Sequence, residues 1–223
     1  MHPIHILQIN TAFSEASVAI SRNGELLHEL NNSNQYDHAS FLQPAILEIC
    51  KICGIELEAL HALSVVNGPG SYTGLRVGLA SAKGICYALK IPLICINTLY
   101  WMAKGNINND VDYICPMIDA RRNEVFTALY DKSGNAILEP TAMILETNSF
   151  AEYLNKKKIA FIGDGSVKCS LIIQHNNALF PENVHSSSHL SKISYETFQK
   201  KEFQDLAYTE PFYIKAFHST QVK

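Results

Sequence analysis

The sequence lacks several features that would each point to a definite class of protein. It has no excess of positive charge, because 18 lysine and arginine residues stand against 21 aspartate and glutamate residues, for a formal net charge of −3. A chain that holds nucleic acid by itself needs basic side chains to neutralise phosphates, so this composition argues against that class. No apolar run approaches the roughly 20 residues of a membrane-spanning helix. The N-terminus, Met1-His2-Pro3-Ile4, carries no basic region or cleavage site, so we expect a cytoplasmic protein without membrane attachment.

The sequence also lacks the standard phosphate-binding motifs, although one stretch has their general form. The segment Asn67–Gly78 reads N-G-P-G-S-Y-T-G-L-R-V-G, follows the apolar run Leu63–Val66 and precedes a helical pattern that reaches Leu89. Strand, glycine turn and helix are the parts of an anion-binding loop. A P-loop, however, needs Gly-Lys-Ser/Thr where this chain has Gly74-Leu75-Arg76, and the glycine spacing is one residue too long for a dinucleotide fingerprint. The stretch therefore predicts a strand–turn–helix unit without a recognised nucleotide site.

Small residues recur every four positions along the helix after this turn, at Gly74, Gly78 and Ala82, with Gly84 nearby. An interior glycine costs about 1 kcal/mol relative to alanine, so a helix that carries several needs a compensating contact. Close approach of another backbone is that contact. It comes either from the sheet of the same chain or from a partner, and the spacing leaves both open.

Two spacings of cysteine and histidine are candidates for metal or redox chemistry. Cys50 and Cys53 form a C-x-x-C that ends a helix just before Gly54, where the helix dipole opposes a thiolate, and no second pair completes a zinc site. We interpret this pair as structural. His185 and His189 have the spacing of zinc ligands on one helix face, but the three serines between them predict a turn and a helix cap instead.

The order of the predicted elements repeats along the chain. The first half is predicted to contain strands at 5–10, 16–21 and 25–30, a helix at about 40–53, and strands at 63–66 and 93–97. After a linking segment, Thr98–Asn109, strands follow at 113–118, 124–130 and 136–138, then a helix at about 147–156 and a strand at 159–162. Further helices are predicted at about 167–175 and 190–201.

Two successive copies of three strands, a helix and a strand are an internal repeat. This pattern predicts an α/β chain with the duplicated ribonuclease-H-like (actin-like ATPase, ASKHA) fold, in which two mixed-sheet subdomains are flanked by helices. We expect an N-terminal subdomain at 1–103, which carries the partner-binding helices, and a C-terminal subdomain at 104–223.

In that fold, the first hairpin of each half faces the cleft between the halves. The first hairpin carries Asn10 and Thr11, and the second carries Asp119, Arg121 and Glu124. Asn10 stands where such folds place a metal-directing aspartate, and an amide lacks the negative charge that holds Mg²⁺. This departure argues against a kinase or ATPase. The roles of Asp119 and Arg121 stay open.

The chain resembles the TsaB family, also called YeaZ, of tRNA threonylcarbamoyladenosine biosynthesis. The resemblance rests on Ile9–Ile20, Gly68–Gly84, Ile118–Asp131 and Pro211–Lys215, of which Gly68–Gly84 is the most specific. The family usually has I-D-T where this chain has Ile-Asn-Thr, which again argues against a metal at the first hairpin. The metal-binding His-x-x-x-His of the paralogue TsaD is replaced here by Asn97–Trp101.

The resemblance implies a non-catalytic scaffold subunit without a metal or cofactor of its own. Nucleotide binding is possible only in the complex, and whether it occurs there stays open. It implies pairing with the catalytic paralogue TsaD, which transfers threonylcarbamoyl to the adenosine next to the anticodon of tRNA. It further implies that the ATPase TsaE binds the pair, that tRNA is reached only through the complex, and that the chain alone forms a homodimer through the same helices. The expected interface residues are Phe41, Leu42, Ile46, Ile49, Gly74, Leu75, Arg76, Gly78, Leu79, Ala82 and Lys83.

Two alternative functions would need reactive groups in the same scaffold. A metal-dependent peptidase or acyl transferase would bind its metal through His185 and His189, or through Asp119 and another acid. A small-molecule kinase would use Asp119 with the turn Gly163-Asp164-Gly165 around a nucleotide.

Overall fold

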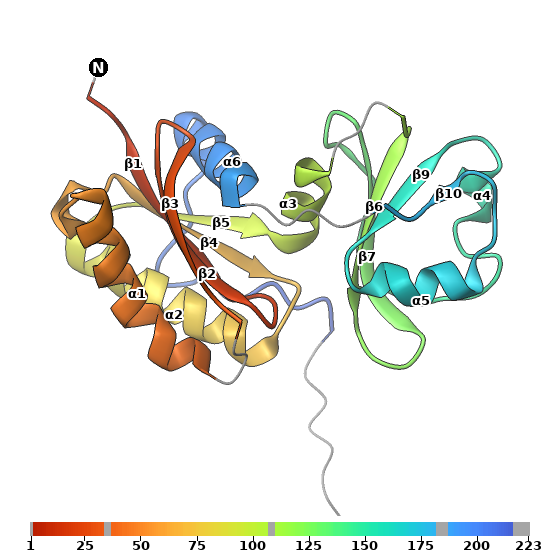
Figure 1. Ribbon diagram of the computed structural model, residues 1–223, viewed down its shortest axis with the longest axis horizontal. Coiled ribbons are helices and arrows are strands. Elements are labelled where there is room, and N and C mark those ends of the chain that lie inside the picture. The colour runs from red at the N-terminus through yellow and green to blue at the C-terminus, as the bar shows by residue number, and fades with distance from the viewer. Residues whose placement is uncertain (1, 34–36, 107–109, 182–186, 216–223) are drawn as a thin grey trace, which may run out of the picture. The chain divides into compact units, whose positions relative to one another are not determined.

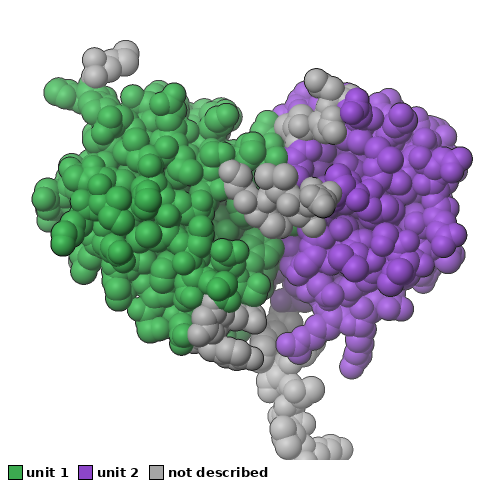
Figure 2. Space-filling model, in the orientation of Figure 1, with its two compact units in different colours: residues 1–105, 184–211 green, residues 106–183, 212–223 purple. Residues whose placement is uncertain are grey.

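The computed structural model describes residues 2–33, 37–106, 110–181 and 187–215. The chain forms two compact units, which Figure 2 colours separately. Unit 1 comprises residues 1–105 and 184–211, and unit 2 comprises residues 106–183 and 212–223. Within the described residues, no helix combines the length and the apolar character that crossing a bilayer requires.

Unit 1 is built on a five-stranded sheet with the order β3-β2-β1-β4-β5 (Figure 1). Its strands are β1 (His5–Asn10), β2 (Ala16–Arg22), β3 (Glu25–Asn32), β4 (Ala62–Gly68) and β5 (Leu93–Asn97). Strands β1, β2 and β3 pair antiparallel, whereas β4 and β5 continue the sheet in parallel from β1. Its helices are α1 (His38–Cys53), the short 3-10 turn η2 (Leu57–Ala59), α2 (Tyr72–Leu89), α3 (Thr98–Gly105) and α6 (Ser187–Lys200).

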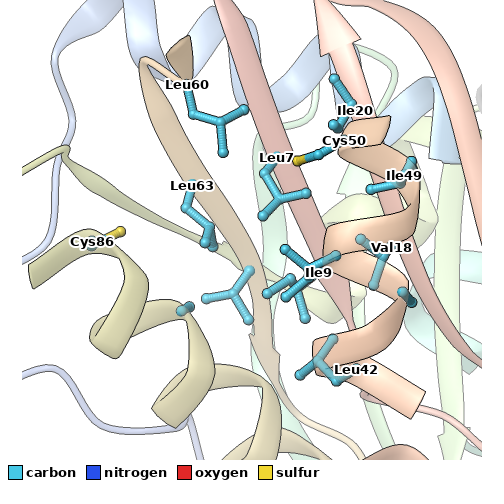
Figure 3. Close-up of a cluster of buried hydrophobic side chains, with 14 of the residues drawn as sticks. Leu7, Ile9, Val18, Ile20, Leu42, Ile49, Cys50, Leu60, Leu63 and Cys86 are labelled. Carbon is cyan, nitrogen blue, oxygen red and sulfur yellow. The ribbon is translucent and has the colours of Figure 1, made fainter. Parts of the chain in front are cut away.

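Helices cover both faces of this sheet, with α1 and α2 on one face and α3 and α6 on the other (Figure 1). The face under α1 and α2 is aliphatic: Leu7, Ile9 and Val18 of the sheet pack with Leu42 and Ile49 of α1 (Figure 3). Central strands that are covered on both sides are expected to read as nearly continuous apolar runs, as β1 and β4 do.

The face under α6 is more polar. Gln8 Nε2 donates to Ser21 Oγ at 2.6 Å, and Ser194 Oγ of α6 donates to Ser64 Oγ at 2.8 Å. Ser191 of α6 is also fully buried. A hydrogen bond between two small hydroxyl groups therefore joins α6 to the sheet beside the buried aliphatic residues Leu190 and Ile193, since buried polar groups need partners.

Residues 184–211 belong to unit 1, whereas the sequence analysis placed them in the subdomain at 104–223. Besides α6, the segment that follows it is also bound to unit 1. The N–H of Gln204 donates to the carbonyl of Leu93 at 2.9 Å, and Lys83 Nζ donates to the carbonyl of Thr209 at 3.1 Å. These contacts join residues more than a hundred positions apart, so the local pattern could not indicate them.

Unit 2 repeats the architecture, with a five-stranded sheet in the order β10-β9-β6-β7-β8. Its elements are β6 (Tyr113–Asp119), β7 (Glu124–Asp131), β8 (Ala136–Ile144), α4 (Ala151–Leu154), β9 (Ile159–Ile162), α5 (Gly165–Ile172) and β10 (Ala178–Leu179). Strands β6 to β10 take the places that β1 to β5 take in unit 1, with the same parallel and antiparallel pairings. The predicted duplication of a ribonuclease-H-like half is confirmed.

Some elements differ from those predicted. The expected link Thr98–Asn109 begins with helix α3, whose start is capped by Asn97 Oδ1, which accepts from the N–H of Tyr100 at 3.1 Å. Buried Trp101 fixes this helix on unit 1. The helix predicted at 147–156 shortens to α4, because Phe150 adopts a left-handed backbone conformation (φ 62°) just before it.

Candidate functional site

The glycine-rich turn between β4 and α2 is bonded to the end of β1. The N–H of Ser71 donates to the carbonyl of Ala12 at 2.7 Å, and Thr11 Oγ1 donates to the carbonyl of Gly74 at 2.7 Å. Ser71 Oγ caps α2 by accepting from the N–H of Gly74 at 3.3 Å. A Cβ at Gly70 would lie 2.4 Å from the carbonyl oxygen of Ala12. The turn is therefore shaped by close backbone contact inside unit 1.

The glycine–alanine column of α2 faces this same contact, which corrects the expectation that it meets a partner. A Cβ at Gly74 would lie 2.0 Å from the carbonyl oxygen of Thr11, and a Cβ at Gly78 would lie 2.3 Å from Thr11 Oγ1. Ala82 is fully buried in the core of unit 1. The small residues are needed because α2 crosses the end of β1 at a distance that leaves no room for a side chain.

Five large apolar residues predicted at the partner interface are likewise buried in the core of their own unit. They are Leu42, Ile46 and Ile49 on α1, and Leu75 and Leu79 on α2. Figure 3 shows Leu42 and Ile49 directed toward the sheet. The apolar stripe of an amphipathic helix packs against its own sheet here, so these side chains are not exposed on the surface of unit 1.

The three other predicted interface residues reach the surface to different extents. Phe41 is half-buried against the core, and Arg76 is exposed with its guanidinium 4.0 Å from the centre of the Tyr72 ring. Lys83 is half-buried, and its Nζ donates to the carbonyl of Thr209. Lys83 therefore holds the C-terminal segment of its own unit, and its contact with a partner stays a prediction.

The outward sides of α1 and α2 expose apolar groups that the sequence analysis did not select. Leu47 and Ile52 of α1 are 62% and 50% exposed, and Tyr87 of α2 is 80% exposed. Gln43 Nε2 donates to Ser81 Oγ at 3.1 Å and joins the two helices. We call this surface the outer face, defined by Leu47, Ile52, Ala80, Gly84, Tyr87 and Ala88.

Gly84 differs from the two buried glycines of the same helix. A Cβ built on Gly84 would meet no described atom within 4 Å, and the residue is exposed. Since glycine inside a helix costs about 1 kcal/mol relative to alanine, Gly74 and Gly78 have a steric reason within unit 1 and Gly84 has none among the described residues.

An open cavity of about 480 Å³ adjoins the outer face at the C-terminal end of α1. It is lined by Leu47, Cys50, Lys51, Gly54, Ile55, Glu56, Leu57 and Glu58. Lys51 in the last turn of α1 lies in this lining together with Glu56 and Glu58, so the cavity presents charges of both signs.

The polar residues of the first hairpin serve the structure of unit 1. Asn10 is buried, and its Oδ1 accepts from the N–H of Ala12 at 3.1 Å. Thr11 is fully buried beneath α2. Both side chains hold the turn on which the glycines of α2 pack.

The second hairpin, in unit 2, is held by one lysine. Asp119 Oδ1 accepts from the N–H of Arg121 at 2.6 Å and from Lys168 Nζ of α5 at 2.7 Å. Lys168 Nζ also donates to the carbonyls of Arg122 at 2.7 Å and Glu124 at 3.1 Å. The hydrogen bond from Lys168 lowers the pKa of the Asp119 carboxyl group below its usual value, which keeps this carboxylate ionised and paired.

The segment Gly163-Asp164-Gly165 has a structural role beside it. Asp164 Oδ1 accepts from the N–H of Asp119 at 2.9 Å. A Cβ at Gly165 would lie 2.9 Å from Met117 Cβ, so α5 also packs closely on β6, although less closely than α2 packs on the end of β1. No local signal in the sequence points to Lys168 or Lys215, because Lys168 lies 49 positions from its partner Asp119 and Lys215 lies 91 positions from its partner Glu124.

Among the residues that the structure describes, no group of three or more histidine, cysteine, aspartate or glutamate side chains is arranged to hold a metal ion. His189 lies in α6, which begins at Ser187, so the turn predicted before Leu190 is wrong. Burial and the nearby Lys192 lower the pKa of His189. His185 lies outside the described residues.

The six cysteines are free thiols, and the pair in the C-x-x-C motif ends α1 as predicted. Burial is the main cause that raises the pKa of both Cys50 and Cys53. A raised pKa disfavours the thiolate that redox exchange needs, which supports the structural interpretation.

The sequence was compared with known protein families and with known relatives. The family described as "TsaD: tRNA N6-adenosine threonylcarbamoyltransferase" matches residues 27–223. Relatives named "tRNA threonylcarbamoyladenosine biosynthesis protein TsaB" include that of Escherichia coli (strain K12), which is 25% identical over 224 residues covering 95% of each chain. The TsaB protein of Buchnera aphidicola subsp. Acyrthosiphon pisum is 31% identical over 167 residues, 72% of this chain and 75% of that protein.

Two solved structures from Pseudomonas aeruginosa share the fold. YeaZ superposes with a TM-score of 0.76 at 23% identity, over 94% of this chain and 99% of the other. An uncharacterised protein with similarity to the peptidase YeaZ superposes with a TM-score of 0.81 at 22% identity, over 95% and 100% of the two chains. With the family match, the similar TsaB sequences and the duplicated sheet taken together, the chain belongs to the TsaB (YeaZ) family.

Proposed function

We propose that the chain is a non-catalytic scaffold subunit in tRNA threonylcarbamoyladenosine biosynthesis, and that it pairs with a TsaD-like catalytic paralogue through the outer face of α1 and α2. A TsaE-like ATPase then binds the pair, and tRNA is reached through the complex. The isolated chain forms a homodimer through the same face. The names of the similar TsaB proteins support the pathway.

The observation that carries the pairing is the exposed glycine on an apolar helix face. Packed helices lie about 8–10 Å apart, and small residues at the contact allow the closer distances. Gly84 offers such a contact without serving any within the described part of unit 1. Leu47 of α1 and Tyr87 of α2 are large exposed apolar groups on the same two helices, and exposed apolar surface of this kind marks protein–protein contacts.

The polar side chains of the two hairpins are engaged in structural hydrogen bonds, which supports a non-catalytic role. Asn10 holds a backbone turn, and the Asp119 carboxylate is bonded to Lys168. A peptidase, acyl transferase or kinase of this fold would need such groups directed at a metal or a substrate. Calorimetry with Mg·ATP and elemental analysis of the purified chain test these alternatives, since stoichiometric binding of either ligand would support an enzyme.

The pairing is tested by placing a charge on the outer face. Leu47→Asp and Tyr87→Asp are each expected to weaken association with the cognate TsaD-like protein by about 2 kcal/mol, roughly 30-fold, as for an anchor residue of an interface. The measurement is isothermal titration calorimetry, with circular dichroism to show that each variant is folded. Leu171→Asp on α5 is the matched control, because Leu171 is 78% exposed and lies in unit 2.

The control is expected to bind like the unaltered chain. If all three variants bind equally well, the outer face is not the contact. If the unaltered chain does not associate with the TsaD-like protein at all, the proposed function itself fails.

A further inference from the structure

Two adjacent arginines form the tip of the turn between β6 and β7. Arg121 and Arg122 are both exposed, and both have a left-handed backbone conformation, with φ of 69° and 50°. This conformation is uncommon for residues other than glycine. The turn is bonded to its surroundings, since Lys168 donates to the carbonyl of Arg122 and the N–H of Leu145 donates to the carbonyl of Asn123 at 2.8 Å.

Two lysines near this turn form ion pairs with its carboxylates. Lys168 pairs with Asp119, and Lys215 pairs with Glu124. Within the described residues, neither Arg121 nor Arg122 has an ion-pair partner. Asp164 is the further acid bonded to this turn, so the two arginines together carry more positive charge than it balances. They are consecutive residues of a turn that Lys168 of α5 and Leu145 hold in place.

The chemistry of this pair suits phosphate. A guanidinium group presents a planar set of donors that matches two phosphate oxygens at once, and adjacent guanidinium groups match a chain of phosphates. We infer that Arg121 and Arg122 contact the phosphate backbone of tRNA when the chain is part of its complex. This inference rests on the proposed function, which supplies a polyanionic RNA as the substrate. Because the formal net charge of the chain is −3, the interaction is local and adds to binding by the other subunits.

The test uses the assembled complex of the chain with its TsaD-like and TsaE-like partners and fluorescently labelled tRNA. Anisotropy titrations at about 50 to 200 mM salt give the affinity and its salt dependence. Arg121→Ala/Arg122→Ala is expected to weaken tRNA binding about 10-fold or more, and to lower the slope of log K against log salt by about 1 for each phosphate that is no longer neutralised. Arg121→Lys/Arg122→Lys is expected to keep the slope and to recover part of the affinity, since it keeps the charge.

The matched control is Lys156→Ala/Lys158→Ala, which removes the same charge from exposed positions of the same unit. It is expected to leave tRNA binding within about 2-fold, since a charge that touches no phosphate adds little in salt. An equal loss of tRNA affinity in the control would show that the loss in the arginine variant comes from the lower overall charge. That result would overturn the inference. Unchanged tRNA binding by the arginine variant would also overturn it. If that variant then associated more weakly with the TsaD-like or the TsaE-like protein, the turn would instead contact an acidic surface of that protein.

Pairing with the TsaD-like protein is measured separately on every variant. A failure of the unaltered chain to pair refutes the proposed function and this inference together. Normal pairing with unchanged tRNA affinity refutes this inference alone.

Discussion

Two glycines of helix α2 should respond in opposite directions to replacement by alanine. Alanine stabilises a helix interior by about 0.5–1 kcal/mol relative to glycine. At Gly84 a Cβ would meet no described atom within 4 Å, so Gly84→Ala should gain this amount in the isolated chain. At Gly74 the same gain is opposed by a Cβ only 2.0 Å from the carbonyl oxygen of Thr11.

Thr11 cannot easily move away from the new methyl group. It is fully buried, and its Oγ1 is bonded to the carbonyl of Gly74. Overpacking of this kind costs about 1–3 kcal/mol, and loss of the hydrogen bond adds about 1 kcal/mol. After the gain in helix propensity, we expect Gly74→Ala to destabilise unit 1 by about 2 kcal/mol, which puts the two variants about 3 kcal/mol apart.

Urea unfolding followed by tryptophan fluorescence measures this difference in unit 1. Trp101 is the only tryptophan, and it is buried in α3 of unit 1. With an m-value of about 2 kcal/mol/M, the unfolding midpoint should fall by about 1 M for Gly74→Ala and rise by about 0.3–0.5 M for Gly84→Ala. The protein is kept dilute, because a homodimer would add its own stability. Equal midpoints for the two variants would refute the described orientation of α2.

Two further predictions concern titration. The Asp119 carboxyl group should titrate below its usual pKa in an NMR experiment, and return toward that value in Lys168→Met, because the bond from Lys168 is the largest cause of the shift. A carboxyl group with a lowered pKa stabilises the fold above its unfolded pKa and loses this contribution as the pH falls through the folded pKa, so the acid sensitivity of unit 2 should weaken in the variant. Burial raises the pKa of the Cys86 and Cys169 thiols to about 12, so these two buried thiols should react with Ellman's reagent at pH 8 only after unfolding. Fast reaction in the folded chain would contradict their described burial.

Local patterns in the sequence were sufficient to predict most strands of the two sheets. Strands β5 and β9 have the predicted bounds, because short apolar runs ended by proline, glycine or asparagine are strong local signals. The repeated order of strands and helices was enough to predict the duplicated fold. The helices were less predictable: α4 is shortened by the backbone at Phe150, and α3 is fixed by burial of Trp101.

The sequence indicated amphipathic helices at α1 and α2, but not which of their residues face outward. The hydrophobic stripe of α1 showed that Leu42 and Ile49 are buried, but a stripe does not show whether a sheet or a partner covers it. The turns that carry Asn10 and Asp119 were found by their place in the repeat. Lys168, which holds the second turn, follows no local signal, since only the folding of α5 onto β6 brings it there.

By itself, the sequence determined the duplicated order of elements and the family to which the chain belongs, because periodicity, turn residues and the Gly68–Gly84 motif are local properties. Only the tertiary structure decided which glycines of α2 serve its own sheet and which one faces outward. Gly74, Gly78 and Gly84 have the same propensity in the sequence, and the atoms that crowd the first two belong to a segment far away along the chain.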